Sequence, residues 1–224
     1  MTVQLFCGYD EREAAGYHTF CASVLRRASK PVSFRPLASM GLPEGTNTFT
    51  LSRFLVAYLM GFKGHAIFVD ACDMLMLGDV AELDALFDRR YAVQVVKHPD
   101  YKSQHARKYI GTEMECEQSN YPRKNWASAM LVNAEHAAWF AATPKFISLA
   151  KPVDLLQFRY MEDSEIGEIP PEWNVLIDEG QKHEGAKLLH WTAGLPTFRH
   201  YRNARGSSDW FGEFEHMTKA MQHG

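Results

Sequence analysis

Short apolar runs alternate with helix-forming segments along most of the chain. Such runs are buried most readily as strands covered by helices, and connections of helical length favour parallel strands. The pattern therefore predicts an α/β fold with a Rossmann-like, mixed but mainly parallel central sheet flanked by helices. The expected strands are 3–10, 32–37, 66–70, 91–96 and 127–134, and the expected helices are 11–29, 50–60, 80–87 and 135–144.

The length and composition are typical of one soluble globular domain. The 224 residues are 46% hydrophobic and 23% charged, without an internal repeat or linker, so we expect a single domain over 1–224. Its last element should be an amphipathic helix at about 207–222, because apolar residues from Trp210 onward share one helical stripe. A net charge of −3 argues against a general nucleic-acid binder.

The sequence predicts no transmembrane segment. Its N-terminus lacks the basic and apolar regions of a signal peptide, and no run approaches the ~18 apolar residues of a transmembrane helix. Four cysteines lie far apart without CxxC spacing, which argues against a disulfide framework or a zinc knuckle. We therefore expect a cytoplasmic protein with reduced thiols.

Carboxylates directly follow two of the predicted strands. Asp10 ends the first, and Asp70 ends the run IFVD, with Asp73 three residues later. Ligands of open α/β sheets lie at these carboxyl ends, where two carboxylates and a third ligand could hold Mg²⁺ or Mn²⁺ beside a diphosphate. Residues three apart on a strand face opposite sides, so Asp70 and Asp73 converge only through a bulge or a turn starting at Ala71. The competing interpretation is that one of them caps a turn or pairs with an arginine.

A polar segment at 97–126 is longer than a simple connection requires. Its tyrosines and Trp126 favour an ordered, ligand-facing segment over a flexible linker. It could close over a diphosphate, meet an anionic acceptor or simply form a solvated surface. Its basic residues are Lys97, His98, Lys102, His105, Arg107, Lys108, Arg123 and Lys124.

Four segments together resemble one enzyme family. The stretch SRFLVAYLMGFKGHAIFVDACDMLMLGDVAELDALF at 52–87 resembles the core of glycosyltransferases of the glycogenin and lipopolysaccharide galactosyltransferase type, family 8, which have the GT-A fold. WASAMLVNAEHAAW at 126–139 is similar to their buried strand, and EDSEIGEIPPEWN at 162–174 to their Asp-Gln-Asp segment. HWTAGLPTF at 190–198 resembles their late motif of His, Gly and Pro.

The resemblance implies roles for individual residues. Asp73 corresponds to the second aspartate of the family's Asp-x-Asp motif, whereas Asp70 corresponds to the first only if one residue is inserted. The implied metal ligands are Asp70, Asp73 and His190. The implied donor-binding residues are Tyr9, Asp10, Arg53, Asp70 and Gly194, and the implied catalytic or acceptor-side residues are Arg53, Asp163 and Glu165.

The resemblance also implies a reaction. It is the Mn²⁺- or Mg²⁺-dependent transfer of a sugar, with retention, from a nucleotide diphosphate donor such as a UDP-sugar to a hydroxyl of a carbohydrate, lipid-linked or protein acceptor. The departure from Asp-x-Asp leaves open a nucleotide-sugar-binding protein without turnover. A metal-dependent nucleotidyltransferase is a further alternative, although the acidic GYDEREAAG at 8–16 lacks its glycine-rich, basic signature.

Overall fold

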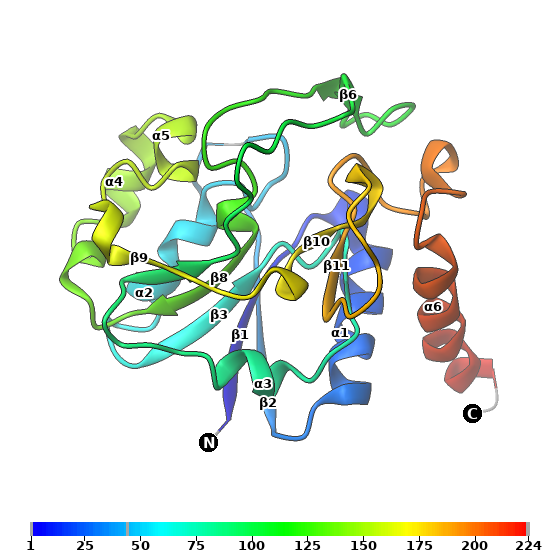
Figure 1. The fold of residues 1–224 in the computed structure, drawn as a ribbon, viewed down its shortest axis with the longest axis horizontal. Coiled ribbons are helices and arrows are strands. Elements are labelled where there is room, and N and C mark those ends of the chain that lie inside the picture. The colour runs from blue at the N-terminus through cyan, green and yellow to red at the C-terminus, as the bar shows by residue number, and fades with distance from the viewer. Residues whose placement is uncertain (1, 44, 223–224) are drawn as a thin grey trace.

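The core of the protein is a six-stranded sheet (Figure 1). The computed structural model describes residues 2–43 and 45–222, except for the side chains of 220–222. The strands are β1 (Val3–Gly8), β2 (Val32–Leu37), β3 (His65–Val69), β5 (Val93–Val95), β8 (Ala129–Asn133) and β9 (Ile166–Glu168), in the order β2-β1-β3-β8-β5-β9. Only β8 runs antiparallel to its neighbours, β3 and β5. The predicted mixed, mainly parallel sheet is therefore confirmed.

The described structure also contains two smaller sheets, six α-helices and eight 3₁₀ helices. One sheet joins β10 (Val175–Leu176), β11 (Leu188–His190) and β4 (Met74–Met76), and the other joins β6 (Arg107–Lys108) and β7 (Cys116–Glu117). The α-helices are α1 (Ala14–Arg27), α2 (Val56–Leu59), α3 (Val80–Asp84), α4 (Pro144–Leu149), α5 (Pro152–Leu156) and α6 (Ser207–Gln222). The 3₁₀ helices are Glu11–Glu13, Ser52–Leu55, Trp126–Ser128, Ala137–Trp139, Asp163–Glu165, Pro171–Trp173, Ile177–Glu179 and Arg199–Tyr201.

The central strands are apolar because both faces of the sheet are covered. Residues 66–69 of β3 and all of β8 are buried, as expected for strands whose two faces are both covered. Helix α1 packs against β4, and α6 packs on α1, farther from the sheet (Figure 1). Among the described residues, no helix has the length and apolar character needed to cross a membrane.

One predicted element is wrong. The expected helix at 135–144 is only the short 3₁₀ turn Ala137–Trp139, and Pro144 begins α4 instead of ending a helix. Proline has no N–H and a fixed φ, which suit the first turn of a helix as well as they terminate one. The Thr143 hydroxyl caps α4 by accepting a hydrogen bond from the Phe146 N–H at 3.3 Å.

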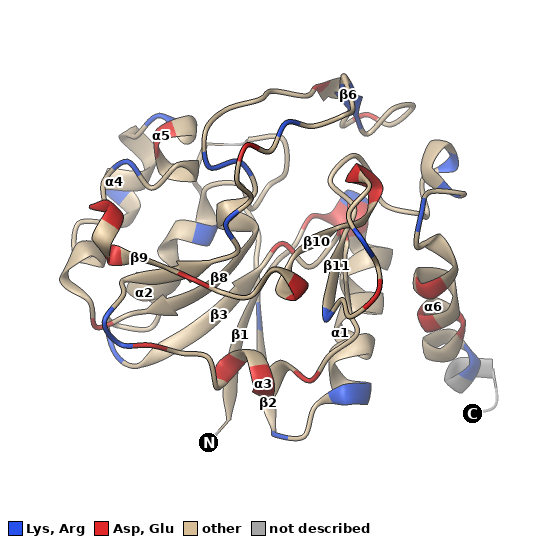
Figure 2. Ribbon diagram, viewed as in Figure 1, with Lys and Arg blue, Asp and Glu red and all other residues tan. Residues whose placement is uncertain are grey.

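The buried carboxylate of Glu213 in α6 forms ion pairs with two arginines of α1. The side chain of Glu213 is 2% exposed, and its oxygens accept hydrogen bonds from Arg26 at 2.9 and 2.6 Å and from Arg27 at 2.9 Å. The charged side chains of α6 are mainly acidic, whereas those of α1 are Arg26 and Arg27, so the ion pairs of Glu213 join helices of opposite charge (Figure 2).

We expect Glu213→Gln to lower the free energy of unfolding by about 1–3 kcal/mol at pH 7, because charge-assisted hydrogen bonds are lost. Burial opposes ionisation, but the two arginines outweigh it and lower the pKa of Glu213. The contribution should be complete above pH ~4.3 and disappear as the pH falls through the lower folded-state pKa. Urea unfolding of the unaltered protein and of Glu213→Gln from pH 7 to pH 3 measures this contribution. A difference in unfolding free energy that stays constant over this pH range contradicts the prediction.

Candidate active site

The chain leaves β3 through a tight turn that carries both aspartates. Cys72 N–H donates to the Asp70 carbonyl at 2.7 Å, closing a three-residue turn around Ala71. Ala71 has φ 61, a left-handed value that costs a non-glycine residue about 1 kcal/mol or more. This turn redirects the chain, so carboxylates three residues apart line the same cavity. The turn at Ala71 required by the sequence is therefore present.

Strand pairing brings His190 to the two aspartates. Asp73 immediately precedes β4, and β4 pairs antiparallel with β11, which places His190 opposite Met74. His190 Nε2 lies 3.5 Å from Asp73 Oδ2. One ligand atom each from Asp70, Asp73 and His190 can be chosen so that all lie within 4.8 Å of one another. Residues 117 positions apart thus form one cluster.

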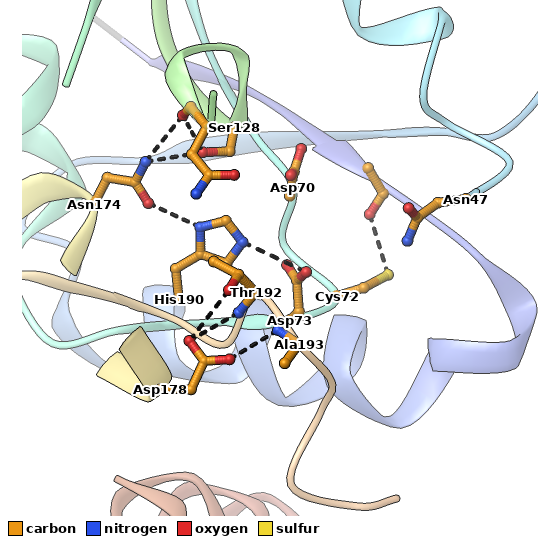
Figure 3. A network of polar contacts seen from close by, with 12 residues as sticks. Asn47, Asp70, Cys72, Asp73, Ser128, Asn174, Asp178, His190, Thr192 and Ala193 are labelled. Atoms are coloured by element: carbon orange, nitrogen blue, oxygen red, sulfur yellow. Dashed lines mark hydrogen bonds and ion pairs between the residues drawn. The ribbon is translucent and has the colours of Figure 1, made fainter. Parts of the chain in front are cut away.

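The His190 ring lies between Asn174, to which it is hydrogen-bonded, and the Asp73 carboxylate, which lies at ion-pair distance (Figure 3). His190 Nδ1 lies 3.0 Å from Asn174 Oδ1, and Asn174 Nδ2 donates to Ser128 Oγ at 2.8 Å. That second bond orients the amide, so Nδ1 carries the proton and donates it to Oδ1. Nε2 therefore faces the Asp73 carboxylate, and in the neutral ring it presents its lone pair to that side.

Burial and neighbouring opposite charges act in opposite directions on the pKa values of Asp70 and of His190. Arg53 Nη1 lies 2.6 Å from Asp70 Oδ1, as an ion pair without hydrogen-bond geometry. Burial nevertheless raises the pKa of Asp70 to about 6, because it outweighs the charge of Arg53. Burial opposes protonation of His190, but the Asp73 and Asp70 carboxylates outweigh it and raise the pKa.

The donor set fits a divalent cation. Oδ1 of Asp70 and Oδ1 of Asp73 are buried and have no hydrogen-bond partner in the described part of the chain. Asp70 Oδ1 instead faces the Arg53 guanidinium as an ion pair at 2.6 Å. Buried carboxylate oxygens normally have hydrogen-bond partners, so two that lack them beside an imidazole nitrogen are candidate ligands. Two carboxylates and one imidazole suit Mg²⁺ or Mn²⁺.

The cluster lies at a cavity of about 300 Å³. Arg53 also lines it, and its Nη1 donates to the Ala127 carbonyl at 2.9 Å. The segment 97–126 is ordered and forms much of the wall. Its contributions are Lys108, Tyr109, Glu117, Gln118, Ser119, Tyr121, Lys124 and Asn125.

The two predicted residues after β1 lie outside the cavity lining. Asp10 is fully buried, and its carboxylate accepts hydrogen bonds from Arg12 at 2.8 and 2.6 Å and from the Thr48 N–H at 3.0 Å. Burial opposes ionisation, but these bonds lower the pKa of Asp10. Tyr9 packs edge-on against Tyr17, with ring centroids 5.1 Å apart. Asp10 thus stabilises the loop after β1 in the structure.

Three other predicted residues also lie outside the lining. The Asp163 side chain is 84% exposed and pairs with Arg123. Glu165 accepts from the Glu162 N–H at 2.8 Å, as part of a capping box. Gly194 is required for packing, because an added Cβ would lie 2.3 Å from the Tyr201 ring. The structure therefore brings together Arg53, Asp70, Asp73 and His190, but not these three.

Sequence reasoning missed a polar chain that lies near the cluster of Asp70, Asp73 and His190. Asn47 Nδ2 donates to Glu13 Oε2 at 2.8 Å and lies 3.0 Å from Tyr109 Oη. Glu13 and Tyr109 are almost fully buried, and Tyr109 has the left-handed φ of 57. The three residues come from distant segments, and no local pattern in the sequence indicates that they meet.

Solved structures with similar folds are glycosyltransferases. The apo structure of the bifunctional glycosyltransferase WbbM gives a TM-score of 0.66 at 13% identity, over 99% of this chain and 51% of WbbM. GlyE from Streptococcus pneumoniae TIGR4 gives 0.62 at 9% identity, over 99% of this chain and 63% of GlyE. The chain therefore spans less than two thirds of either protein.

The galactosyltransferase LgtC, solved with donor and acceptor sugar analogues, is matched over nearly its whole length. Its TM-score is 0.59 at 12% identity, over 96% of both chains. At such identities the likeness concerns the fold, and the predicted GT-A fold is confirmed.

Sequence comparison gives the family. No family model matches the chain. The curated relative Protein CDI from Arabidopsis thaliana is 33% identical over 232 residues, which cover 96% of this chain and 87% of the relative. The chain belongs to the family of Protein CDI.

Proposed function

We propose that the protein is a metal-dependent glycosyltransferase that moves a sugar from a nucleotide diphosphate donor to an acceptor hydroxyl. The observation that carries this proposal is the buried cluster of Asp70, Asp73 and His190 at the cavity of a glycosyltransferase fold. UDP as the nucleotide and retention of configuration rest on the resemblance to family 8. Four free cysteines agree with a reducing compartment, so we place the reaction in the cytoplasm.

In this proposal each residue of the cluster has a physical task. Asp70, Asp73 and His190 would hold Mn²⁺ or Mg²⁺, which when bound would supply positive charge beside the diphosphate leaving group. Arg53 adds a fixed positive charge on the same side, 2.6 Å from Asp70. The ordered segment 97–126 limits the access of water to the cavity.

Product analysis tests the proposal, with a panel of nucleotide sugars in one arm and nucleoside triphosphates plus sugar 1-phosphates in the other, each with and without Mn²⁺. Metal-dependent release of the nucleoside diphosphate supports a glycosyltransferase. Binding of donor without release indicates the inert binding protein, and consumption of nucleoside triphosphate with release of pyrophosphate indicates a nucleotidyltransferase. Either of the last two results contradicts the proposal.

Asn174 should act as a positioning residue for the metal ligand His190. We expect Asn174→Leu to weaken Mn²⁺ binding about 10- to 100-fold, because the imidazole loses the acceptor that fixes its orientation. Ser128→Ala should have a smaller effect, since it removes only the group that orients Asn174. Calorimetric titration with Mn²⁺ measures both, and unchanged affinity in Asn174→Leu refutes the role.

A further inference from the structure

Two lysines line the cavity without a carboxylate partner. In the part of the chain that the structure describes, neither Lys108 Nζ nor Lys124 Nζ forms an ion pair within 4.0 Å. Lys124 is only 6% exposed, and its Nζ donates to the Ser119 carbonyl. Both lysines belong to the segment 97–126, which contains β6. The lysines and arginines of this segment are blue in Figure 2.

The geometry of both lysines is held by aromatic rings. Lys108 Nζ lies 5.2 Å from the centroid of the Tyr109 ring, and Lys124 Nζ lies 5.6 Å from that of Tyr121. These rings also line the cavity. Such contacts stabilise an ammonium group without neutralising it. The two charges are therefore positioned in advance and remain available to a ligand.

A buried ammonium without a counter-ion is unfavourable. Burial, followed by the charge of Lys108, lowers the pKa of Lys124 to about 8, and Glu179 and Cys116 act in the opposite direction. Buried charges in proteins are normally paired, because the loss of water around an ion is costly. Lys124 therefore lacks the partner that a buried charge normally has, and Lys108 adds a second positive charge, half-buried, to the same cavity.

We propose that Lys108 and Lys124 bind the diphosphate of the donor. This inference rests on the proposed function and adds two donor-binding residues to it. Phosphate oxygens would accept hydrogen bonds from both ammonium groups, which provide point charges for a leaving group whose negative charge grows during transfer.

The charge balance of the cavity favours the donor as the source of the anion. Three cationic side chains (Arg53, Lys108 and Lys124) and three anionic ones (Asp70, Asp73 and Glu117) line it. With His190 neutral, a divalent cation leaves two positive charges, which match the two negative charges of a nucleotide diphosphate sugar. The loaded cavity is then neutral, so an uncharged acceptor group fits it better than a second anion.

The test compares Lys108→Met/Lys124→Met with Lys102→Met, which removes an exposed charge from the same segment. Calorimetry in the presence of Mn²⁺ uses UDP, uridine and inorganic pyrophosphate as probes. We expect the double variant to lose about tenfold in affinity per lysine for UDP and pyrophosphate, with no change for uridine. The control should bind all three like the unaltered protein, and thermal unfolding monitors folding.

The three probes distinguish failure of the lysine assignment from failure of the proposed function. Unchanged UDP and pyrophosphate affinity in the folded double variant overturns the proposal. If that variant instead loses only the binding of inorganic phosphate to protein already loaded with UDP and Mn²⁺, the anion belongs to the acceptor, and the assignment to the donor is overturned. Unaltered protein that binds pyrophosphate but no nucleotide diphosphate contradicts the proposed function, while the pyrophosphate arm still tests the lysines.

Discussion

We expect Asp73→Asn to lower metal-dependent turnover of the nucleotide sugar at least about a hundredfold, or about 3 kcal/mol in the barrier. The change replaces a carboxylate by a neutral amide of the same size, so the cation loses one of its two anionic ligands. Asp73 is 5% exposed, and its Oδ1 has no hydrogen-bond partner among the described residues. The measurement is release of the nucleoside diphosphate at several Mn²⁺ concentrations.

The stability of Asp73→Asn should not fall together with its activity. Without metal, Asp73 adds a second buried carboxylate beside Asp70, so its neutralisation should leave the thermal unfolding temperature unchanged or higher. A loss of activity without loss of stability distinguishes a metal ligand from a structural residue. Asp209→Asn is the matched control, because that side chain lies in α6, is 38% exposed and is outside the cavity lining. Full Mn²⁺-dependent turnover in Asp73→Asn would remove the site assignment.

The parts of the fold that the sequence predicts are those set by local patterns. Runs such as 66–70 are apolar because the strand is buried in the core, and β3 forms there at His65–Val69. At Pro144 the local pattern is ambiguous, since proline both ends and begins helices. The Thr143 cap, which the structure shows, resolves it.

The site is partly predictable for the same reason. Asp70 and Asp73 follow a buried strand, so both had to lie at its carboxyl end, and the turn at Ala71 was the condition for their convergence. Asp10 satisfies the same rule, yet Arg12, two residues later, occupies its carboxylate. The contact of Asn47 with Tyr109 joins residues 62 positions apart, and no periodicity reports such a contact.

Gly16→Ala should destabilise the protein by about 3 kcal/mol, although alanine is the better helix former. Gly16 lies in α1, directly against the turn that carries the aspartates. An added Cβ would lie 1.9 Å from the Cys72 carbonyl oxygen and 2.8 Å from Leu195 Cδ2. A backbone oxygen cannot move aside as a flexible side chain does, so either α1 or the turn must shift. Urea unfolding measures the loss.

The matched control is Gly212→Ala in α6, where an added Cβ meets no atom within 4 Å. There the same change should stabilise by about 0.5–1 kcal/mol, because alanine loses less backbone entropy on forming a helix. Opposite signs at the two glycines would show that the contact with Cys72, and not helix propensity, decides the effect at Gly16. Since Cys72 lies between Ala71 and Asp73, any Gly16→Ala protein that still folds should also bind Mn²⁺ more weakly. Equal stability of the two variants, with unchanged Mn²⁺ affinity in Gly16→Ala, would mean that the turn does not depend on the close approach of α1.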